Sequence, residues 1–180
     1  MNIDGVLADF EGEFCDRFGF ENRHLVNLEE RYPDIDKEII REFVNSPSTY
    51  EDLVPLFGGI RLLRDAKEKG FYVLLITSRP KQVTEVTREW LEDYYIEYNE
   101  LWYAQNKPIA IHEFNHMYIN RKIFLLVDDI PSNFDGLPNY VTGLAWSQLW
   151  NENYYPRARY NEKSQRVEVK PDTVSGWVKF

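Results

Sequence analysis

Two near-continuous apolar runs stand out along the chain, FYVLLITS at Phe71–Ser78 and IFLLVDD at Ile123–Asp129. Such runs, without regular polar alternation, are typical of strands that are buried on both faces, as in a parallel sheet. Shorter apolar stretches predict further strands near Leu101–Ala104 and Tyr140–Ala145. Residues 1–7 have the pattern of a strand end that leads into a turn. The apolar pattern therefore predicts a largely parallel sheet.

Helical stretches lie between the predicted strands. They cover Asp9–Phe18 before Gly19, Asp36–Asn45, Ile60–Lys69 between the Gly58-Gly59 pair and Gly70, and Pro80 to about Tyr94. Residues 108–120 fit either a helix or an insertion. Strands that alternate with helices indicate an α/β fold with a doubly wound parallel sheet.

A length of 180 residues suits one domain, 1–180. Residues 19–57 are polar and aromatic, and we predict that they form a small cap inserted into the core. The core then consists of residues 1–18 and 58–180. In doubly wound sheets ligands bind at the carboxyl ends of the strands. This rule places three polar pairs along one edge: Asn2 and Asp4, Thr77 and Ser78, and Asp128 and Asp129.

The acidic members of these pairs predict a magnesium site. Two acids after a buried strand, Asp128 and Asp129, are costly unless they are solvated, paired or bound to metal. Taken alone, they fit an ordinary loop start or helix cap. Together with Asp4 they favour a hard cation, because Mg²⁺ prefers oxygen ligands. Asp128 and Asn2 would supply side-chain oxygens and Asp4 its backbone carbonyl.

Hydroxyl and cationic groups predict a phosphate site beside the acids. The hydroxyls and backbone N–H groups of Thr77 and Ser78 can hold a phosphate oxygen, or cap the helix that begins at Pro80. Lys107 follows a predicted strand and would neutralise developing negative charge, with Lys122 as its rival and a solvated surface role as the alternative. His112 and His116 stand at a metal-binding helical spacing, but no third ligand is evident, which favours a structural or surface role.

Composition narrows the classes of partner. A net charge of −9 and a pI of about 4.9 argue against nucleic-acid polymers, which need a basic surface. No apolar run approaches the roughly 20 residues of a membrane span. The single cysteine, Cys15, cannot form an internal disulfide. Together with the lack of a visible signal peptide, this leads us to expect a cytoplasmic protein that acts on small molecules.

Several motifs occur in the order and with the spacing of a known family. They are NIDGVLADFEGEFCDRF, DLVPLFGG, LLITSRP, QNKP, LLVDDIP and a C-terminal SGW. This set resembles the haloacid dehalogenase (HAD) phosphatases, and within them the 5′(3′)-deoxyribonucleotidases. The resemblance implies Mg²⁺-dependent hydrolysis of nucleoside monophosphates through a phospho-aspartate, and a homodimer.

The resemblance also implies roles for individual residues. Asn2 stands at the position of the nucleophile, and Asp4 matches the general acid and base. Asp128 matches a metal ligand, with Asp129 in support. The residues that match substrate contacts are Phe10, which would stack on the base, Thr77, Ser78 and Lys107, and the inserted Arg79 would add a further phosphate contact. Tyr50 is a second candidate for a pocket aromatic, although simple packing explains it better.

The chain departs from the family pattern at four places. An asparagine replaces the nucleophile, Arg79 is inserted into the TSP turn, and the stretch between Lys107 and Asp128 is long. Only Met1 precedes Asn2, where the family has about four or five more apolar residues in its central strand. We expect either a chain cut short relative to its gene or another segment in that place. The alternatives to a nucleotidase are a hydrolase of another small phosphate ester and an inactive nucleotide-binding protein.

Overall fold

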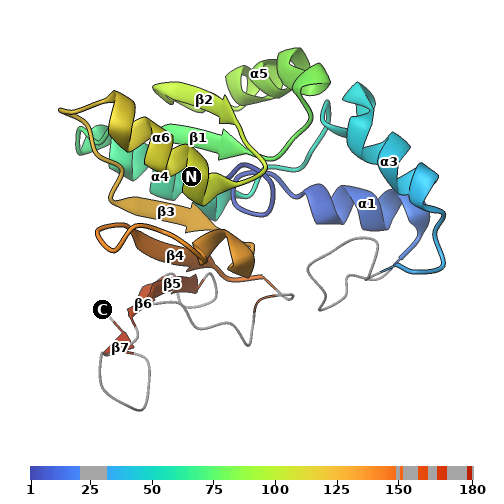
Figure 1. Cartoon of the computed structure of the whole chain (residues 1–180). Coiled ribbons are helices and arrows are strands. Elements are labelled where there is room, and N and C mark those ends of the chain that lie inside the picture. The colour runs from blue at the N-terminus through green and yellow to red at the C-terminus, as the bar shows by residue number, and fades with distance from the viewer. Residues whose placement is uncertain (21–31, 149–150, 152–157, 162–165, 170–177, 180) are drawn as a thin grey trace.

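The computed structural model describes residues 1–20, 32–148, 151, 158–161, 166–169 and 178–179. The elements of this part of the chain run from α1 (Phe10–Phe18) to β7 (Val178–Lys179), and helices alternate with strands in its middle part (Figure 1). Several of its strands pair in parallel. The predicted α/β class is therefore confirmed.

The described strands form two sheets. β1 (Leu74–Thr77) pairs in parallel with β2 (Glu100–Tyr103). The second sheet has the order β3-β4-β5-β6-β7, in which the first three strands are parallel and the last two pairings are antiparallel. Its strands are β3 (Leu125–Asp128), β4 (Thr142–Trp146), β5 (Ala158–Asn161), β6 (Arg166–Val169) and β7. We predicted one doubly wound sheet, and the described strands do not form one.

The first two residues connect these sheets. Met1 donates its terminal N–H to the carbonyl of Leu74 at 2.8 Å and accepts from the N–H of Ile76 at 3.0 Å. Asn2 donates its backbone N–H to the carbonyl of Val127 at 2.9 Å. The N-terminus thus lies between β1 and β3 (Figure 1). Burial lowers the pKa of the Met1 ammonium to about 5, with the Lys107 charge adding to the effect.

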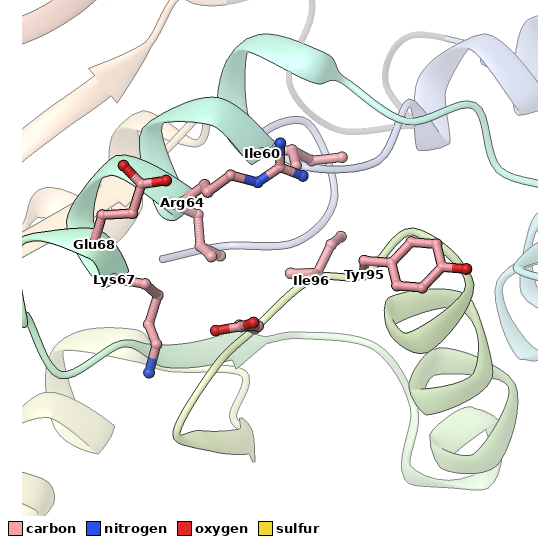
Figure 2. Close-up of a pocket in the computed structure, with 8 residues that line it drawn as sticks. Ile60, Arg64, Lys67, Glu68, Tyr95 and Ile96 are labelled. Carbon is pink, nitrogen blue, oxygen red and sulfur yellow. The ribbon is translucent and has the colours of Figure 1, made fainter.

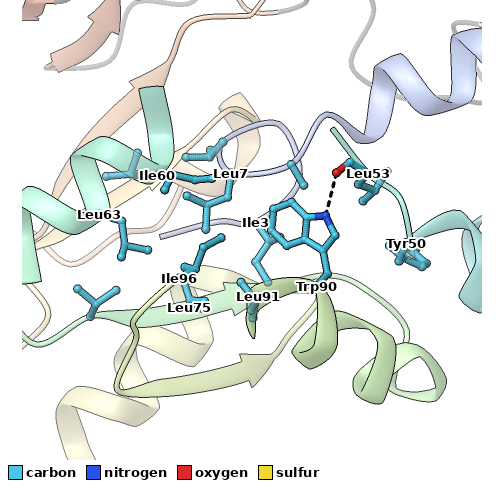
Figure 3. Packing of buried hydrophobic residues seen from close by; sticks show 14 of the residues in the cluster. Ile3, Leu7, Tyr50, Leu53, Ile60, Leu63, Leu75, Trp90, Leu91 and Ile96 are labelled. Atoms are coloured by element: carbon cyan, nitrogen blue, oxygen red, sulfur yellow. Dashed lines mark hydrogen bonds between the residues drawn. The ribbon is translucent and has the colours of Figure 1, made fainter. Parts of the chain in front are cut away.

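Helices cover both faces of β1. Leu75 packs in the larger core cluster with residues of α4 (Phe57–Glu68) and α5 (Thr84–Asp93) (Figure 3). Leu74 and Ile76 point to the other face and pack against α6 (Lys107–Met117). This alternation explains why the run is apolar without interruption. The pattern of residues 108–120 fitted either a helix or an insertion, and residues 108–117 of this stretch form most of α6.

The beginning of α4 corrects a sequence prediction. We expected the helix to start after the Gly58-Gly59 pair, but it includes both glycines. A Cβ on Gly59 would come within 1.8 Å of the Val6 carbonyl oxygen, so a side chain has no room there. Glycine here permits close packing of the helix on the N-terminal turn, rather than ending a loop.

The segment before α4 packs partly on its own. α3 (Lys37–Asn45) and α1 form a separate cluster in which Phe14, Ile40 and Phe43 are buried. Short 3₁₀ helices occur at Pro47–Thr49, Lys81–Val83 and Pro131–Phe134. The division into a core and a cap at 19–57 stays a prediction, and residues 21–31 lie outside the described part.

Two further features of the described part concern binding. A pocket of about 260 Å³ lies between α4 and the turn after α5, lined by Arg64, Lys67 and Glu68 on one side and by Tyr95 and Ile96 on the other (Figure 2). None of the residues predicted for the site lines it. Among the described helices, none has both the length and the apolar character needed to cross a bilayer.

Candidate functional site

Asn2 lies at the centre of the predicted site. It follows Met1 at the end of the segment between β1 and β3, and only 5% of its surface is exposed. Its side-chain N–H₂ donates to the backbone carbonyl of Asp4 at 2.7 Å and to Oδ1 of Asp129 at 2.9 Å. Its Oδ1 accepts from the N–H of Ile3 at 2.9 Å. The amide therefore joins the turn after residue 2 to the end of β3.

A buried ion pair stands at the end of β3. Lys107 Nζ donates to Asp128 Oδ2 at 2.6 Å, and both side chains are almost fully buried. The other carboxylate oxygen of Asp128 accepts from the backbone N–H of Ile130 and from Asn133 Nδ2. Lys107 lies at the first position of α6, after the N-cap Asn106. The rival Lys122 donates to the carbonyl of Asn115 instead, and the role of Lys107 in binding phosphate stays a prediction.

The surroundings of Asp129 shift the pKa of its carboxyl. Burial, and next the charge of Asp128, raise its pKa to about 7. Lys107 and the hydrogen bond from Asn2 act in the opposite direction. The carboxylate also lies against Gly5, where a Cβ would come within 2.3 Å of Oδ2. The turn after Asp4 therefore needs glycine to let this carboxylate approach Asn2.

Arg79 binds Asp4 instead of pointing freely into the site. Its Nε lies 3.1 and 3.0 Å from the two carboxylate oxygens of Asp4, and its Nη2 lies 2.7 Å from Oδ1. Its Nη1 donates to the hydroxyl of Thr87, and the guanidinium lies 4.5 Å from the centre of the Tyr50 ring. The Arg79 side chain is 1% exposed. The prediction that it contacts phosphate is untested, but its charge is already paired.

The hydroxyl residues after β1 differ in exposure. Thr77 is fully buried, and its hydroxyl accepts from the N–H of Arg79 at 3.2 Å. Ser78 is exposed and donates to the carbonyl of Ala104 at 3.3 Å. Ser78 is thus the hydroxyl that a solvent-borne phosphate can reach first, whereas Thr77 shapes the turn.

The predicted aromatic contacts serve mainly in packing. Phe10 lies between the two core clusters, with its ring 5.8 Å from that of Tyr50 and 5.3 Å from that of Phe43. Tyr50 is 1% exposed and donates its hydroxyl to the carbonyl of Val44. Its burial raises the pKa of its hydroxyl. Base stacking by Phe10 stays a prediction.

Sequence reasoning missed three amide side chains that support the site. Asn133 binds Asp128, Asn151 Nδ2 donates to the carbonyl of Asp129 at 2.7 Å, and Gln148 Nε2 donates to the carbonyl of Gly5 at 2.8 Å. Only Asn133 had a usable signal, since it follows the acidic pair within the same turn. The other two come from a distant loop after β4, which no local pattern connects to the acids.

The donor set can be tested against a magnesium ion. Within the described residues, no three His, Cys, Asp or Glu side chains gather as a metal cluster. His112 and His116 therefore have no third ligand of these types there. The carbonyl of Asp4 and Oδ1 of Asp129 nevertheless converge on a single donor atom, Asn2 Nδ2. Few carboxylates and a backbone carbonyl suit Mg²⁺, which usually keeps several waters. These oxygen donors are of the kind that fits Mg²⁺, with the amide of Asn2 at the point where they converge, and binding of the ion stays a prediction.

Comparisons with known proteins add little beyond this geometry. No family model matches the chain, and no curated protein matches it. One similar solved structure is a HAD-superfamily hydrolase from Ehrlichia chaffeensis, with a TM-score of 0.47 and 11% sequence identity. The match covers 81% of this chain and 85% of that one. Similarity at this level does not assign the chain to that superfamily, so the function proposed below rests on the site residues.

Proposed function

We propose that the chain is a HAD-type phosphatase in its architecture and binds small phosphate esters, with nucleoside monophosphates as the preferred class. One observation carries the proposal. Asn2, at the predicted nucleophile position, contacts both Asp129 and the carbonyl of Asp4, beside the buried Lys107–Asp128 pair. Asn2 and Asp129 are more than a hundred positions apart in sequence, and their contact supports a site that would suit phosphoryl transfer.

The residues divide the proposed reaction between them. A carboxylate at position 2 would attack phosphorus, while Asp4 gives a proton to the leaving ester oxygen. Asp4 would then take a proton from the water that hydrolyses the phospho-aspartate. Lys107 and the groups of the turn after β1 would bind phosphate oxygens. Mg²⁺, held by the oxygens around Asn2 and Asp128, would offset the negative charge of the phosphate when bound.

Asn2 changes what this site can do. A neutral amide is a poor nucleophile, and loss of a covalent nucleophile costs several orders of magnitude in rate. We therefore expect the chain to bind its ester and Mg²⁺ but to turn over very slowly.

A second candidate is a nucleotide-binding protein without turnover. It is favoured by the hydrogen bonds of Asn2, whose N–H₂ has two acceptors and whose oxygen has one donor. Such an arrangement is stable without a cation, whereas an aspartate at the same place would face Asp129 with like charge. A preference for other phosphate esters is a variant of the first proposal, set by the predicted cap.

The deciding experiment measures phosphate release from nucleoside 5′- and 3′-monophosphates and sugar phosphates with Mg²⁺. It compares the chain, Asn2→Asp, and Asn2→Asp combined with Asp4→Asn. We expect hydrolysis of deoxynucleotides by Asn2→Asp alone. Preference for sugar phosphates would shift the substrate class. Tight nucleotide binding without phosphate release in any variant would favour the binding protein. The proposal would be refuted if no variant bound a phosphate ester or released phosphate.

A further inference from the structure

The pocket between α4 and the turn after α5 is lined by side chains of two kinds (Figure 2). Ile60 and Leu63 of α4 and Ile96 of the turn are buried and belong to the larger core cluster. We call these three residues the pocket floor. The charged residues of the lining, which are more exposed, are Arg64, Lys67, Glu68 and Glu97. A ligand in this pocket would therefore meet an apolar surface and charges of both signs.

The turn that carries Tyr95 ends α5 in a conformation that favours glycine. The N–H of Ile96 donates to the carbonyl of Leu91, and the N–H of Tyr95 donates to the carbonyl of Glu92, each at 2.9 Å. This is the Schellman pattern, in which the residue after the C-cap takes a left-handed backbone. Tyr95 does so with a φ of 52°, and it is the only residue other than glycine with a positive φ in the described part.

Two other helices of the chain end in the same way with glycine. In α1 and α4 the left-handed residue is Gly19 or Gly70, and the next N–H donates to the carbonyl five positions before it. A tyrosine in this conformation is strained, because its Cβ crowds the following carbonyl oxygen. Core packing does not account for the tyrosine, since Tyr95 is 84% exposed. Residues held in strained conformations cluster at ligand sites, and Tyr95 lines this pocket.

The charges of the lining suit a ligand that carries both signs. Arg64 forms no ion pair with another residue of the described part, and a guanidinium can bind a carboxylate through two parallel hydrogen bonds. Lys67 donates to Asn99 Oδ1 at 2.9 Å and keeps two further N–H donors. The carboxylates of Glu68 and Glu97 can accept hydrogen bonds from an ammonium group. They would also repel the dianion of a phosphate ester, which disfavours a second nucleotide site here.

The volume of the pocket limits the size of the ligand. About 260 Å³ is less than the roughly 300–1,000 Å³ of pockets that hold drug-sized molecules. A small molecule with a carboxylate, an ammonium and an apolar body matches the cations, the acids and the pocket floor. An α-amino acid has these three groups on one carbon atom.

We propose that this pocket binds a free α-amino acid with an apolar side chain. The carboxylate binds Arg64 and Lys67, and the ammonium binds the acids of the lining. The side chain lies on the pocket floor, beside Tyr95. The proposal does not depend on the proposed function, because no residue of the predicted phosphate site lines the pocket.

The test measures the binding of L-leucine and L-phenylalanine to the full chain by isothermal titration calorimetry. The tighter binder is then compared with its N-acetyl form, which lacks the ammonium, with its amide, which lacks the carboxylate, and with glycine. We expect each of these three probes to bind at least about tenfold more weakly, because each loses one set of contacts.

Variants separate contact with the ligand from an effect on folding. Arg64→Gln should weaken binding of the amino acid at least about tenfold and leave binding of its amide unchanged. Arg61→Gln is the matched control, since Arg61 is exposed on the same helix and lies outside the pocket lining. Tyr95→Gly should also weaken binding, while the unfolding midpoint stays the same or rises because the strain is removed.

Four outcomes would overturn the proposal. The first is no binding of either amino acid at millimolar concentrations. The second is equally tight binding of the N-acetyl form or of the amide, which would indicate a site for apolar ions of one sign. The third is an equal loss of binding in Arg61→Gln and Arg64→Gln. The fourth is a lower unfolding midpoint in Tyr95→Gly, which would show that Tyr95 serves the fold.

Discussion

Replacing Lys107 by methionine should destabilise the fold strongly. The change keeps a long apolar side chain but removes the ammonium that lies 2.6 Å from Asp128, where both side chains are at most 1% exposed. Asp128 would then keep only the donors from Ile130 and Asn133. Breaking a buried ion pair by removing one partner costs about 3–5 kcal/mol, because the remaining charge is uncompensated. We expect a loss in that range at pH 7.5.

The assay is urea unfolding at pH 7.5 and at pH 4.5. The loss should shrink at the lower pH, because a buried carboxylate without its cation can take up a proton in the folded state. Lys107→Met combined with Asp128→Asn should recover most of the loss, since no buried charge remains. Lys122→Met is the matched control, with an expected loss below about 1 kcal/mol. A loss for Lys107→Met no greater than for this control would refute the reasoning.

Three further predictions concern other parts of the molecule. Arg79→Lys keeps a positive charge but loses the two-point contact with Asp4. In the Asn2→Asp enzyme, we therefore expect this change to shift the apparent pKa values of the pH–rate profile, while the circular dichroism spectrum stays the same. Gly59→Ala should cost about 3 kcal/mol or more in a urea titration, because its Cβ would meet the Val6 carbonyl; a loss below about 1 kcal/mol would contradict the packing described. For Met1, the unfolded chain keeps a proton between pH 5 and 8 that the folded chain releases, so the free energy of unfolding should rise with pH in that window. Acetylation of this nitrogen should remove that part of the slope, as measured by thermal unfolding across the window.

The sequence predicted the elements whose cause is local. The apolar runs correspond to β1 and β3, and the region near Asp36–Asn45 is the helix α3. The predicted start of α4 was wrong because glycine at position 59 is required by close packing against Val6, more than 50 residues away in sequence. A glycine chosen for tertiary packing looks the same in sequence as one that ends a loop.

For the candidate site, the strand-end rule predicted which groups lie near one edge but not the hydrogen-bond partners of those groups. Asn2 and Asp129 were predicted to be close, and the structure places them in contact. That Arg79 binds Asp4, and not an open pocket, depends on the side-chain direction after β1, which no spacing rule gives. The division of the strands into two sheets was not predicted either, because an apolar run indicates a strand but not which strand it pairs with.

The stacking of Arg79 on Tyr50 links the turn after β1 to the segment after α3. Tyr50 belongs to the segment after α3, while Arg79 follows β1 and holds the carboxylate of Asp4. A bulky ester that displaced this ring would remove one contact of the guanidinium and weaken its binding to Asp4, the proposed acid and base. The size of the ligand and the acid–base behaviour of Asp4 would thus both depend on the contact between Arg79 and Tyr50. The test compares pH–rate profiles of the Asn2→Asp enzyme with a small and a bulky ester. Profiles that differ between the two esters, but become the same when Tyr50→Ala is added, would show this dependence. Identical profiles in the Asn2→Asp enzyme would exclude it.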